Sequence, residues 1–248
     1  PVSLLNRWLL PMLPLTMIAA TLAALSAPLP DPLPTLGARA SILINDRHGR
    51  PLYEAIDRQG NKFVPLKLSE IPPVCRQATI ATEDSRFYEH PGVDLLAIAR
   101  AAWRNWRGEG PFSGASTLSQ QLARTFYLSE DERSQRTLRR KLREAWLAWR
   151  LERRYSKDEL LALYMNTGYY GHFAVGIEAA AQSYFGVHAR ELDLAQCALL
   201  AGLLQYPAGY NPLEHPEAVM RRQGVVLDLM VESGHLSQDL ADEAQKEQ

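Results

Sequence analysis

The stretch Ala81-Thr-Glu-Asp-Ser-Arg-Phe-Tyr-Glu-His-Pro-Gly-Val-Asp94 gathers two adjacent carboxylates, an aromatic pair and a histidine just before a Pro-Gly break. We expect a helix over residues 78–88, in which Glu83 and Phe87 lie one turn apart on the same face. Because a residue before proline is biased away from the helical region, this helix should end near His90. Glu83 would then lie at a helix end that opens into a turn, where its carboxylate can meet a ligand. Taken alone, an ordinary solvated, acidic helix end explains the stretch equally well.

The composition is that of a globular protein. The chain has 248 residues, 46% of them hydrophobic, and a formal net charge of -1. It can therefore bury a sizeable core, and as a whole it is not a polyanion binder. Cys75 and Cys197 lack metal-ligand spacing, and neither HExxH nor CxxC occurs, so we expect no structural metal site. We interpret both cysteines as small buried hydrophobic residues, because the sequence gives no basis for pairing them.

The amino-terminal segment has no charged residue from Trp8 to Pro30. Twenty helical residues span about 30 Å, the hydrocarbon thickness of a bilayer. A transmembrane anchor, a cleaved signal peptide and a buried core helix are the alternatives, and the length and flanks favour an anchor over residues 1–29. Arg7 before the apolar run and Asp31 after it favour an exported domain.

Three further regions follow the expected anchor. A proline-rich linker over residues 30–40 is a stiff spacer. The globular domain covers residues 41–240, and a tail covers residues 241–248. Serine, aspartate and glutamate dominate the chain after Gly234, so we expect this end to pack loosely.

The globular domain should be mainly α-helical. It begins with a short β-hairpin over residues 41–53 that turns at residues 46–49. Asp94, Asp193 and the Ser156–Glu159 capping box mark three helix starts. The helices that we expect after the first cover residues 95–106, 134–155, 157–166, 174–185, 194–204 and 217–232, with one more that begins near residue 117. The helix over residues 95–106 has an apolar face that belongs to the core or to a membrane-facing surface. This face consists of Leu95, Ile98, Ala99, Ala102, Trp103 and Trp106.

Two helix starts carry features that suit an anionic ligand. Ser116 or Thr117 can cap a helix whose first N–H groups form an anion site, and Gln120, Gln121 and Arg124 add donors. Five cations crowd residues 136–143 of the next helix. They oppose the helix dipole and one another, so an anionic ligand or membrane surface would offset the cost.

Four blocks occur in the order of a known family's motifs. They are Glu83-Asp-x-x-Phe87-x-x-His90-x-Gly92, Gly114-x-Ser-Thr-Leu-Ser-Gln-Gln121, Arg140-Lys-x-x-Glu144 and Lys157-x-x-Leu-Leu-x-x-Tyr-Met-Asn166. They resemble the peptidoglycan glycosyltransferases (glycosyltransferase family 51), which are monofunctional transglycosylases or domains of class A penicillin-binding proteins. The resemblance covers about residues 40 to 240. A fifth block, Arg222-x-x-x-Val-Leu-x-x-Met230, is looser, because Gln223 stands where the family has a second arginine.

The resemblance implies a lysozyme-like helical domain beside a small, membrane-associated jaw. It implies that Glu83 is the general base and that Glu144 assists the diphosphate leaving group. The other motif residues are expected to bind the substrate or support the base; they are Asp84, Phe87, His90, Gly114, Ser116, Thr117, Gln120, Gln121, Arg124, Arg140 and Lys141. No tightly bound cofactor is implied, and a divalent cation, Mg²⁺ or Mn²⁺, is the candidate helper at Glu144.

The implied reaction is inverting polymerisation of lipid II into β-1,4-linked glycan strands, with release of undecaprenyl diphosphate. The implied location is the bacterial cytoplasmic membrane, with a single span and the catalytic domain on the outer or periplasmic side. Expected partners are lipid II, the growing strand, the membrane, and other cell-wall synthesis and division proteins, but no nucleic acid. We expect a monofunctional enzyme, with an excised part of a bifunctional one as the alternative.

Two other functions compete with this one. A lytic transglycosylase or muramidase would use a single glutamate acid, but it has no use for the cluster of Arg124, Arg140 and Lys141. A non-catalytic membrane scaffold or a basic nucleic-acid binder would explain the arginine-rich helix. The presence of both Glu83 and Glu144 argues against a scaffold.

Overall fold

The computed structural model describes residues 42–45, 51–55, 62–108 and 115–246. The expected anchor and linker, the turn over residues 46–49, and Gly114 lie outside the described residues. Within the described part of the chain, no helix is both long and apolar enough to span a bilayer.

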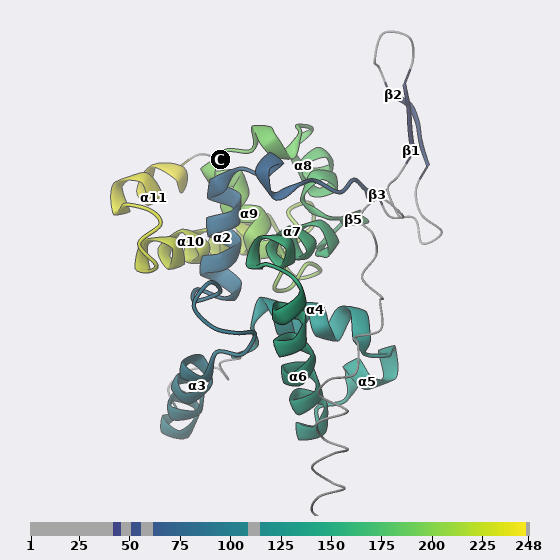
Figure 1. Cartoon of the computed structure of the whole chain (residues 1–248). Coiled ribbons are helices and arrows are strands. Elements are labelled where there is room, and N and C mark those ends of the chain that lie inside the picture. The colour runs from purple at the N-terminus through teal and green to yellow at the C-terminus, as the bar shows by residue number, and fades with distance from the viewer. Residues whose placement is uncertain (1–41, 46–50, 56–61, 109–114, 247–248) are drawn as a thin grey trace, which may run out of the picture. The chain divides into compact units, whose positions relative to one another are not determined.

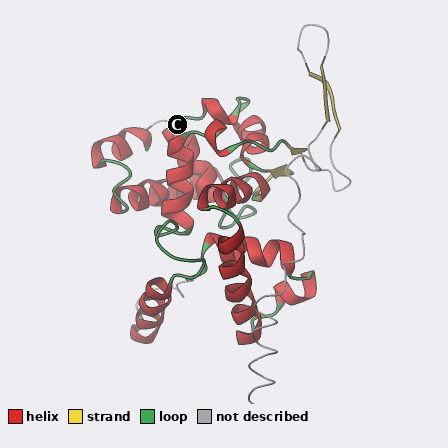
Figure 2. Ribbon diagram, viewed as in Figure 1, coloured by secondary structure: helices red, strands yellow, loops and turns green. Residues whose placement is uncertain are grey.

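Helices make up most of the described chain, as Figure 2 shows, which confirms a mainly α-helical fold. The α-helices are α2 (Pro73–Glu83), α3 (Leu95–Arg107), α4 (Leu118–Tyr127), α5 (Glu130–Ser134), α6 (Leu138–Arg154), α7 (Lys157–Thr167), α8 (Ile177–Phe185), α9 (Leu194–Leu203), α10 (Pro216–Glu232) and α11 (Gln238–Ala244). Two short 3-10 helices are η1 (Leu68–Glu70) and η2 (Ala189–Glu191).

The described strands form two small sheets. In the expected hairpin, β1 (Ile42–Asn45) pairs antiparallel with β2 (Pro51–Ala55). In the second sheet, β5 (Ala174–Val175) lies between β3 (Lys62–Phe63), to which it is parallel, and β4 (Tyr169–Gly171), to which it is antiparallel. Neither β4 nor β5 was predicted from the sequence, and α8 begins at Ile177 rather than at residue 174.

The core is centred on α9, which packs against α2 and α10 (Figure 1). Its residues from Cys197 to Leu203 are all buried, as the apolar pattern of this helix predicts. Small residues allow close approach, because Ala78 and Ala81 of α2 meet Ala198 and Ala201 of α9 in one buried cluster.

Cys75 and Cys197 form a disulfide between α2 and α9. Both residues are buried, as expected, but the sequence did not predict the bond between them. The physical reason is that pairing depends on how two helices cross, which is a tertiary property that the sequence spacing does not contain.

The structure confirms the four helix starts that were predicted from a capping side chain. Asp94 accepts hydrogen bonds from Leu96 N and Ala97 N. Thr117 caps α4, Ser156 forms the capping box of α7 with Glu159, and Asp193 caps α9. These caps could be predicted because each one is local in sequence.

The end of α2 differs from the expectation. The helix covers Pro73–Glu83 and not residues 78–88, so Phe87 lies in the following turn, and the i,i+4 pairing of Glu83 with Phe87 was wrong. Asp84 leaves the helical region because its carboxylate accepts hydrogen bonds from Leu118 N and pairs with His90 Nε2. These tertiary bonds end the helix before the Pro-Gly break is reached.

Two further corrections concern helix bounds. The expected helix over residues 134–155 is interrupted at residues 135–137, because Thr137 caps a separate helix, α6, through Arg140 N. The chain end does not pack loosely, since α11 forms there and buries Ala241 and Ala244 in the α9–α10 cluster. Ala241 and Ala244 lie on one face of α11. This small apolar face indicates a packed helix, although most residues of the segment are polar.

Candidate active site

Glu83 is the last residue of α2, and its carboxylate faces two other helices. Gln121 of α4 donates a hydrogen bond from Nε2 to Glu83 Oε2 (2.8 Å). Tyr164 of α7 donates in turn to Gln121 Oε1 (3.2 Å). Burial raises the pKa of the Glu83 carboxyl, and the Gln121 hydrogen bond and the charge of Arg222 offset only part of this shift. A carboxylate held in this way has the raised pKa that suits a general base near neutral pH.

The turn after Glu83 is fixed by a chain of buried hydrogen bonds. Asp84 Oδ1 lies 2.9 Å from His90 Nε2, and Gly92 N donates to His90 Nδ1 (3.2 Å). Because Nδ1 accepts, we assign the proton of the neutral ring to Nε2. Thr117 Oγ1 donates to Gly92 O (2.6 Å), which links this turn to the start of α4. Asp84, His90 and Thr117 therefore lie inside the protein, behind the base.

Gly92 is required at its position for two reasons. Its φ is +95°, which disfavours side chains. A Cβ there would also lie 2.8 Å from the backbone carbonyl atoms of Ala148. The glycine therefore lets the turn after Glu83 pack directly on α6, the helix that carries Glu144.

Lys157 is a positioning residue that the sequence did not reveal as part of the site. Its Nζ donates to His90 O (2.6 Å), pairs with Glu152 Oε2 (2.7 Å) and lies 4.4 Å from the centre of the Phe87 ring. Phe87 is fully buried. The motif spacing pointed to Lys157 as the start of a helix, but its contact with His90 is separated by 67 residues and is visible only in the fold.

Glu144 lies within a cationic cluster on α6. Its side chain is 1% exposed. Arg140, one helical turn before Glu144, pairs with Glu144 Oε1 (2.7 Å), and Lys141 Nζ lies 3.3 Å from Oε2. Lys141 also donates to Ser116 Oγ, next to the start of α4. The cluster thus places two cations beside the start of α4, an arrangement that stabilises an anion. Two N–H groups of the first turn of α4 already have partners, since Leu118 N donates to Asp84 and Gln120 N to Thr117 Oγ1.

The described residues near Glu144 offer fewer than three carboxylate, histidine or cysteine ligands, so a divalent cation there would need phosphate oxygens of the substrate as further ligands. Oxygen-rich ligand sets hold Mg²⁺ or Mn²⁺. In the part of the chain that the structure describes, no three His, Cys, Asp or Glu side chains converge on one point. The Glu144 carboxylate instead faces Arg140 and Lys141, so we derive no catalytic step from a metal ion.

Two other expected site residues have mixed outcomes. Gln120 completes the capping box of α4, so its side chain is engaged with the backbone of Thr117. Arg124 lies close enough to Tyr164 for its charge to lower the pKa of that hydroxyl, although burial raises the pKa more strongly. Glu83 and Arg124 are therefore both near enough to act on the Tyr164 hydroxyl.

The loose fifth block contributes one residue to the surroundings of Glu83. The charge of Arg222 lowers the pKa of Glu83, and its guanidinium is 6.0 Å from the centre of the Tyr210 ring. Gln223 is buried and donates from Nε2 to Ala195 O of α9 (2.7 Å). At the position of the departure from the family pattern, the side chain therefore links α10 to α9.

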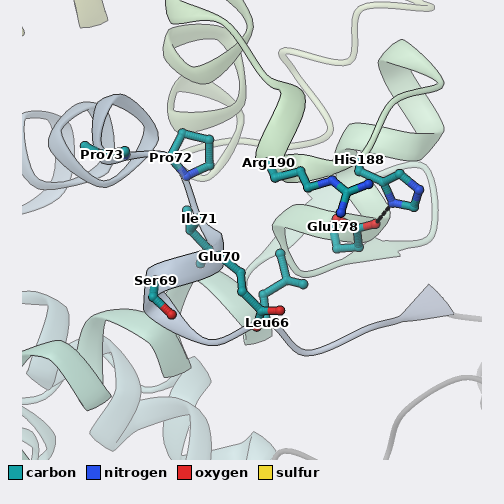
Figure 3. A pocket seen from close by; sticks show the side chains of 9 residues that line it. All are labelled: Leu66, Ser69, Glu70, Ile71, Pro72, Pro73, Glu178, His188 and Arg190. Carbon is teal, nitrogen blue, oxygen red and sulfur yellow. Dashed lines mark hydrogen bonds and ion pairs between the residues drawn. The ribbon is translucent and has the colours of Figure 1, made fainter.

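A separate cavity of about 530 Å³ lies away from these residues (Figure 3). The hydrogen-bonded pair of Glu178 and His188 lies on one wall, and Arg190 is close by. None of the predicted site residues lines it. The site is therefore assigned from the arrangement of Glu83 and Glu144, not from the size of a cavity.

Comparison with known proteins gives a consistent match. The family model described as Transglycosylase matches residues 48–231. Penicillin-binding protein 1A of Neisseria flavescens is 44% identical over 182 residues, which cover 73% of this chain and 22% of the relative. Penicillin-binding protein 1A of Escherichia coli (strain K12) is 45% identical over 195 residues, which cover 78% of this chain and 22% of the relative.

Among solved structures, penicillin-binding protein 1A from Haemophilus influenzae matches with a TM-score of 0.48 and 23% identity. The match covers 85% of this chain and 21% of that chain. The chain spans 22% of the length of each of the two curated relatives named above.

Proposed function

Because the chain belongs to the transglycosylase family, we propose that it is a peptidoglycan glycosyltransferase that joins lipid II units into β-1,4-linked glycan strands. The observation that carries this proposal is the combination of Glu83, a carboxylate with a raised pKa, and the cationic cluster at Glu144. Glu83 activates a hydroxyl, and the cationic cluster stabilises a departing diphosphate. A lytic enzyme releases no diphosphate and has no need of such a cluster.

In the proposed reaction, Glu83 takes the proton from the 4-hydroxyl of the acceptor sugar. The hydroxyl oxygen attacks C1 of the donor sugar while the bond from C1 to the diphosphate oxygen breaks, so the configuration at C1 inverts. The electron pair leaves with undecaprenyl diphosphate. Arg140, Lys141 and Arg124 stabilise the charge that develops on this leaving group.

Gln121 has a positioning role in this scheme. Its hydrogen bond to Glu83 Oε2 orients the carboxylate and lowers its pKa, which works against burial. Asp84, His90, Phe87 and Lys157 hold the turn behind the base. We assign these residues to support of Glu83 and not to direct contact with sugar.

Membrane association of the domain is part of the proposal. The apolar face of α3 is exposed, and its most exposed side chain, that of Trp106, is 77% accessible to solvent. Ala101 is the one residue of α3 that is buried. The helix also carries Arg100, Arg104 and Arg107 and no acidic residue, which suits the headgroup region of a bilayer. We propose that α3 is the jaw element that contacts the membrane.

The proposed location is the outer or periplasmic side of the bacterial cytoplasmic membrane, with the anchor over residues 1–29. The disulfide between Cys75 and Cys197 supports an oxidising compartment, because cytosolic proteins seldom keep such bonds. Lipid II, the growing strand and other cell-wall synthesis proteins are the partners that we propose.

The test is to incubate detergent-purified protein with labelled lipid II and to resolve the products on a gel. We expect a ladder of polymer from the wild type and a loss of about a hundredfold or more in rate for Glu83→Gln. Glu89→Gln is the matched control, because Glu89 lies in the same stretch but is exposed. Soluble sugars released from purified cell wall, with no polymer from lipid II, would instead identify a lytic enzyme.

A further inference from the structure

Tyr164 of α7 is buried, and its hydroxyl group lies one hydrogen-bonded side chain away from the candidate base. Tyr164 is 7% exposed, and its hydroxyl donates to Gln121 Oε1 (3.2 Å). Nε2 of the same amide donates to Glu83 Oε2 (2.8 Å). The Gln121 amide therefore bridges a hydroxyl on α7 and a carboxylate at the end of α2.

The direction of the Gln121 amide follows from what its two neighbours can donate and accept. An ionised carboxylate only accepts hydrogen bonds, so Glu83 requires the NH₂ end of the amide. Oε1 then points to Tyr164, whose hydroxyl can donate. The reversed amide would place Oε1 against Glu83, where two acceptors repel each other until the carboxyl group is protonated. The direction of the amide is thus linked to the charge of Glu83.

Both ends of α7 are fixed by hydrogen bonds to distant parts of the chain, and these bonds place Tyr164. At the start of α7, Lys157 donates to His90 O in the turn behind the base (2.6 Å). Near its end, the fully buried Asn166 accepts from Leu66 N (2.7 Å) and donates to Leu66 O (2.8 Å). Because Tyr164 lies between these two fixed points, its hydroxyl is held in place beside the base.

We propose that Tyr164 is a positioning residue for the reaction, whose hydroxyl holds the Gln121 amide with its NH₂ group toward Glu83; this inference rests on the proposed function. Tyr164 touches no reacting atom in this scheme and acts through Gln121. Without the hydroxyl, Gln121 Oε1 loses this donor, so the amide in its present direction loses stability relative to the reversed one. The ionised form of Glu83 then becomes less stable relative to the protonated form.

Other groups also act on this pair, and they come from several elements. The charged and titratable groups near enough to influence Glu83 or Tyr164 are Asp84, Arg124, Tyr170 and Arg222. All of them remain when only the Tyr164 hydroxyl is removed, so Tyr164→Phe isolates the contribution of that hydroxyl. Burial raises the pKa of Glu83, and the Tyr164 hydroxyl is near enough to lower it directly. The test must therefore separate a direct effect from one that passes through Gln121.

The test compares the acid limb of kcat/KM for lipid II polymerisation in the wild type, Tyr164→Phe, Gln121→Ala and the double variant. Because loss of the hydroxyl favours protonated Glu83, the acid limb of Tyr164→Phe should move to higher pH by about 0.5 to 1 pH unit. In the Gln121→Ala background, Tyr164→Phe should cause no further movement. An unmoved acid limb in Tyr164→Phe would overturn the inference, and so would additive shifts in the double variant, which indicate a direct effect.

Tyr184→Phe is the matched control, because it also removes one tyrosine hydroxyl, which donates to Tyr170 O (2.9 Å). It should lower the melting temperature about as much as Tyr164→Phe does and leave the acid limb in place. An equal shift in the control would assign the effect to a general loss of stability and overturn the inference.

NMR titration of the Glu83 carboxyl in isotope-labelled protein gives the same comparison without substrate, and the signal that is missing in Glu83→Gln identifies it. A wild type that makes no polymer would refute the proposed function. A Glu83 titration that is the same in the wild type and in Tyr164→Phe would refute the role of Tyr164.

Discussion

Helices α2 and α3 flank the same short turn, and each has an apolar face at helical spacing. That of α2 is buried against α9, which a disulfide links to it, and the helix ends in the candidate base. That of α3 is exposed throughout, and Ala101, the one buried residue of α3, lies outside it. The comparison teaches that hydrophobic periodicity predicts a helix but not what covers it. One helix is fixed by the core, and the other leaves its apolar face exposed on the described part of the domain.

Removal of the disulfide should have the largest effect on the α2 side of this comparison. The bond joins residues 122 apart, so the loop-entropy account gives a loss of about 4 to 5 kcal/mol in the free energy of unfolding. The double variant Cys75→Ala with Cys197→Ala should therefore melt at a clearly lower temperature. Two thiols that react with an alkylating agent after denaturation of the unreduced wild type would show that the bond is absent.

Substitutions on the apolar face of α3 should leave the free energy of unfolding nearly unchanged and reduce membrane binding. Trp103→Ser with Trp106→Ser removes two exposed rings, so the free energy of unfolding should change by less than about 0.5 kcal/mol per site. Partition into vesicles that contain anionic lipid should fall about tenfold or more. Flotation with vesicles measures this. A large drop in melting temperature with unchanged flotation would mean that α3 is covered by the protein itself.

The turn between the two helices offers a smaller, pH-dependent test. Burial raises the pKa of Asp94, but the hydrogen bond from Ala97 N, the charge of Arg86 and the hydrogen bond from Leu96 N together lower it. Because the folded-state pKa is lowered, Asp94 stabilises the fold above its unfolded pKa of about 4, and this stabilisation is lost as the pH falls.

Two substitutions separate the cap from the charge at this position. Asp94→Ala should cost about 1 kcal/mol at pH 7, and Asp94→Asn should cost less, because asparagine still caps α3 but no longer pairs with Arg86. Urea unfolding at pH 7 and pH 3 measures both. Equal costs at the two pH values would contradict the charge contribution.

Local signals in the sequence were enough to predict the starts of α3, α7 and α9. The disulfide, the early end of α2 and the contacts of Lys157 could not be predicted, because each depends on residues far apart in the chain. Asp84 shows the limit clearly: its carboxylate binds Leu118 N, and this bond decides where α2 stops. The ordered motifs in the sequence named the candidate site residues. The burial of Asp84, His90 and Phe87 in the structure then separated the residues that support Glu83 from those proposed to meet the substrate.

The central claim is that Glu83 is the base and that its surroundings set its pKa. It is tested most directly by the pH dependence of kcat/KM for lipid II polymerisation in the wild type and in Gln121→Ala. Since the ionised carboxylate is the active form, the rate should rise with pH through a pKa above that of an ordinary glutamate, about 4.3. Gln121→Ala removes a hydrogen bond that lowers this pKa, so its acid limb should move to higher pH. An acid limb at the same pH in both proteins, or one that persists in Glu83→Gln, would contradict the assignment.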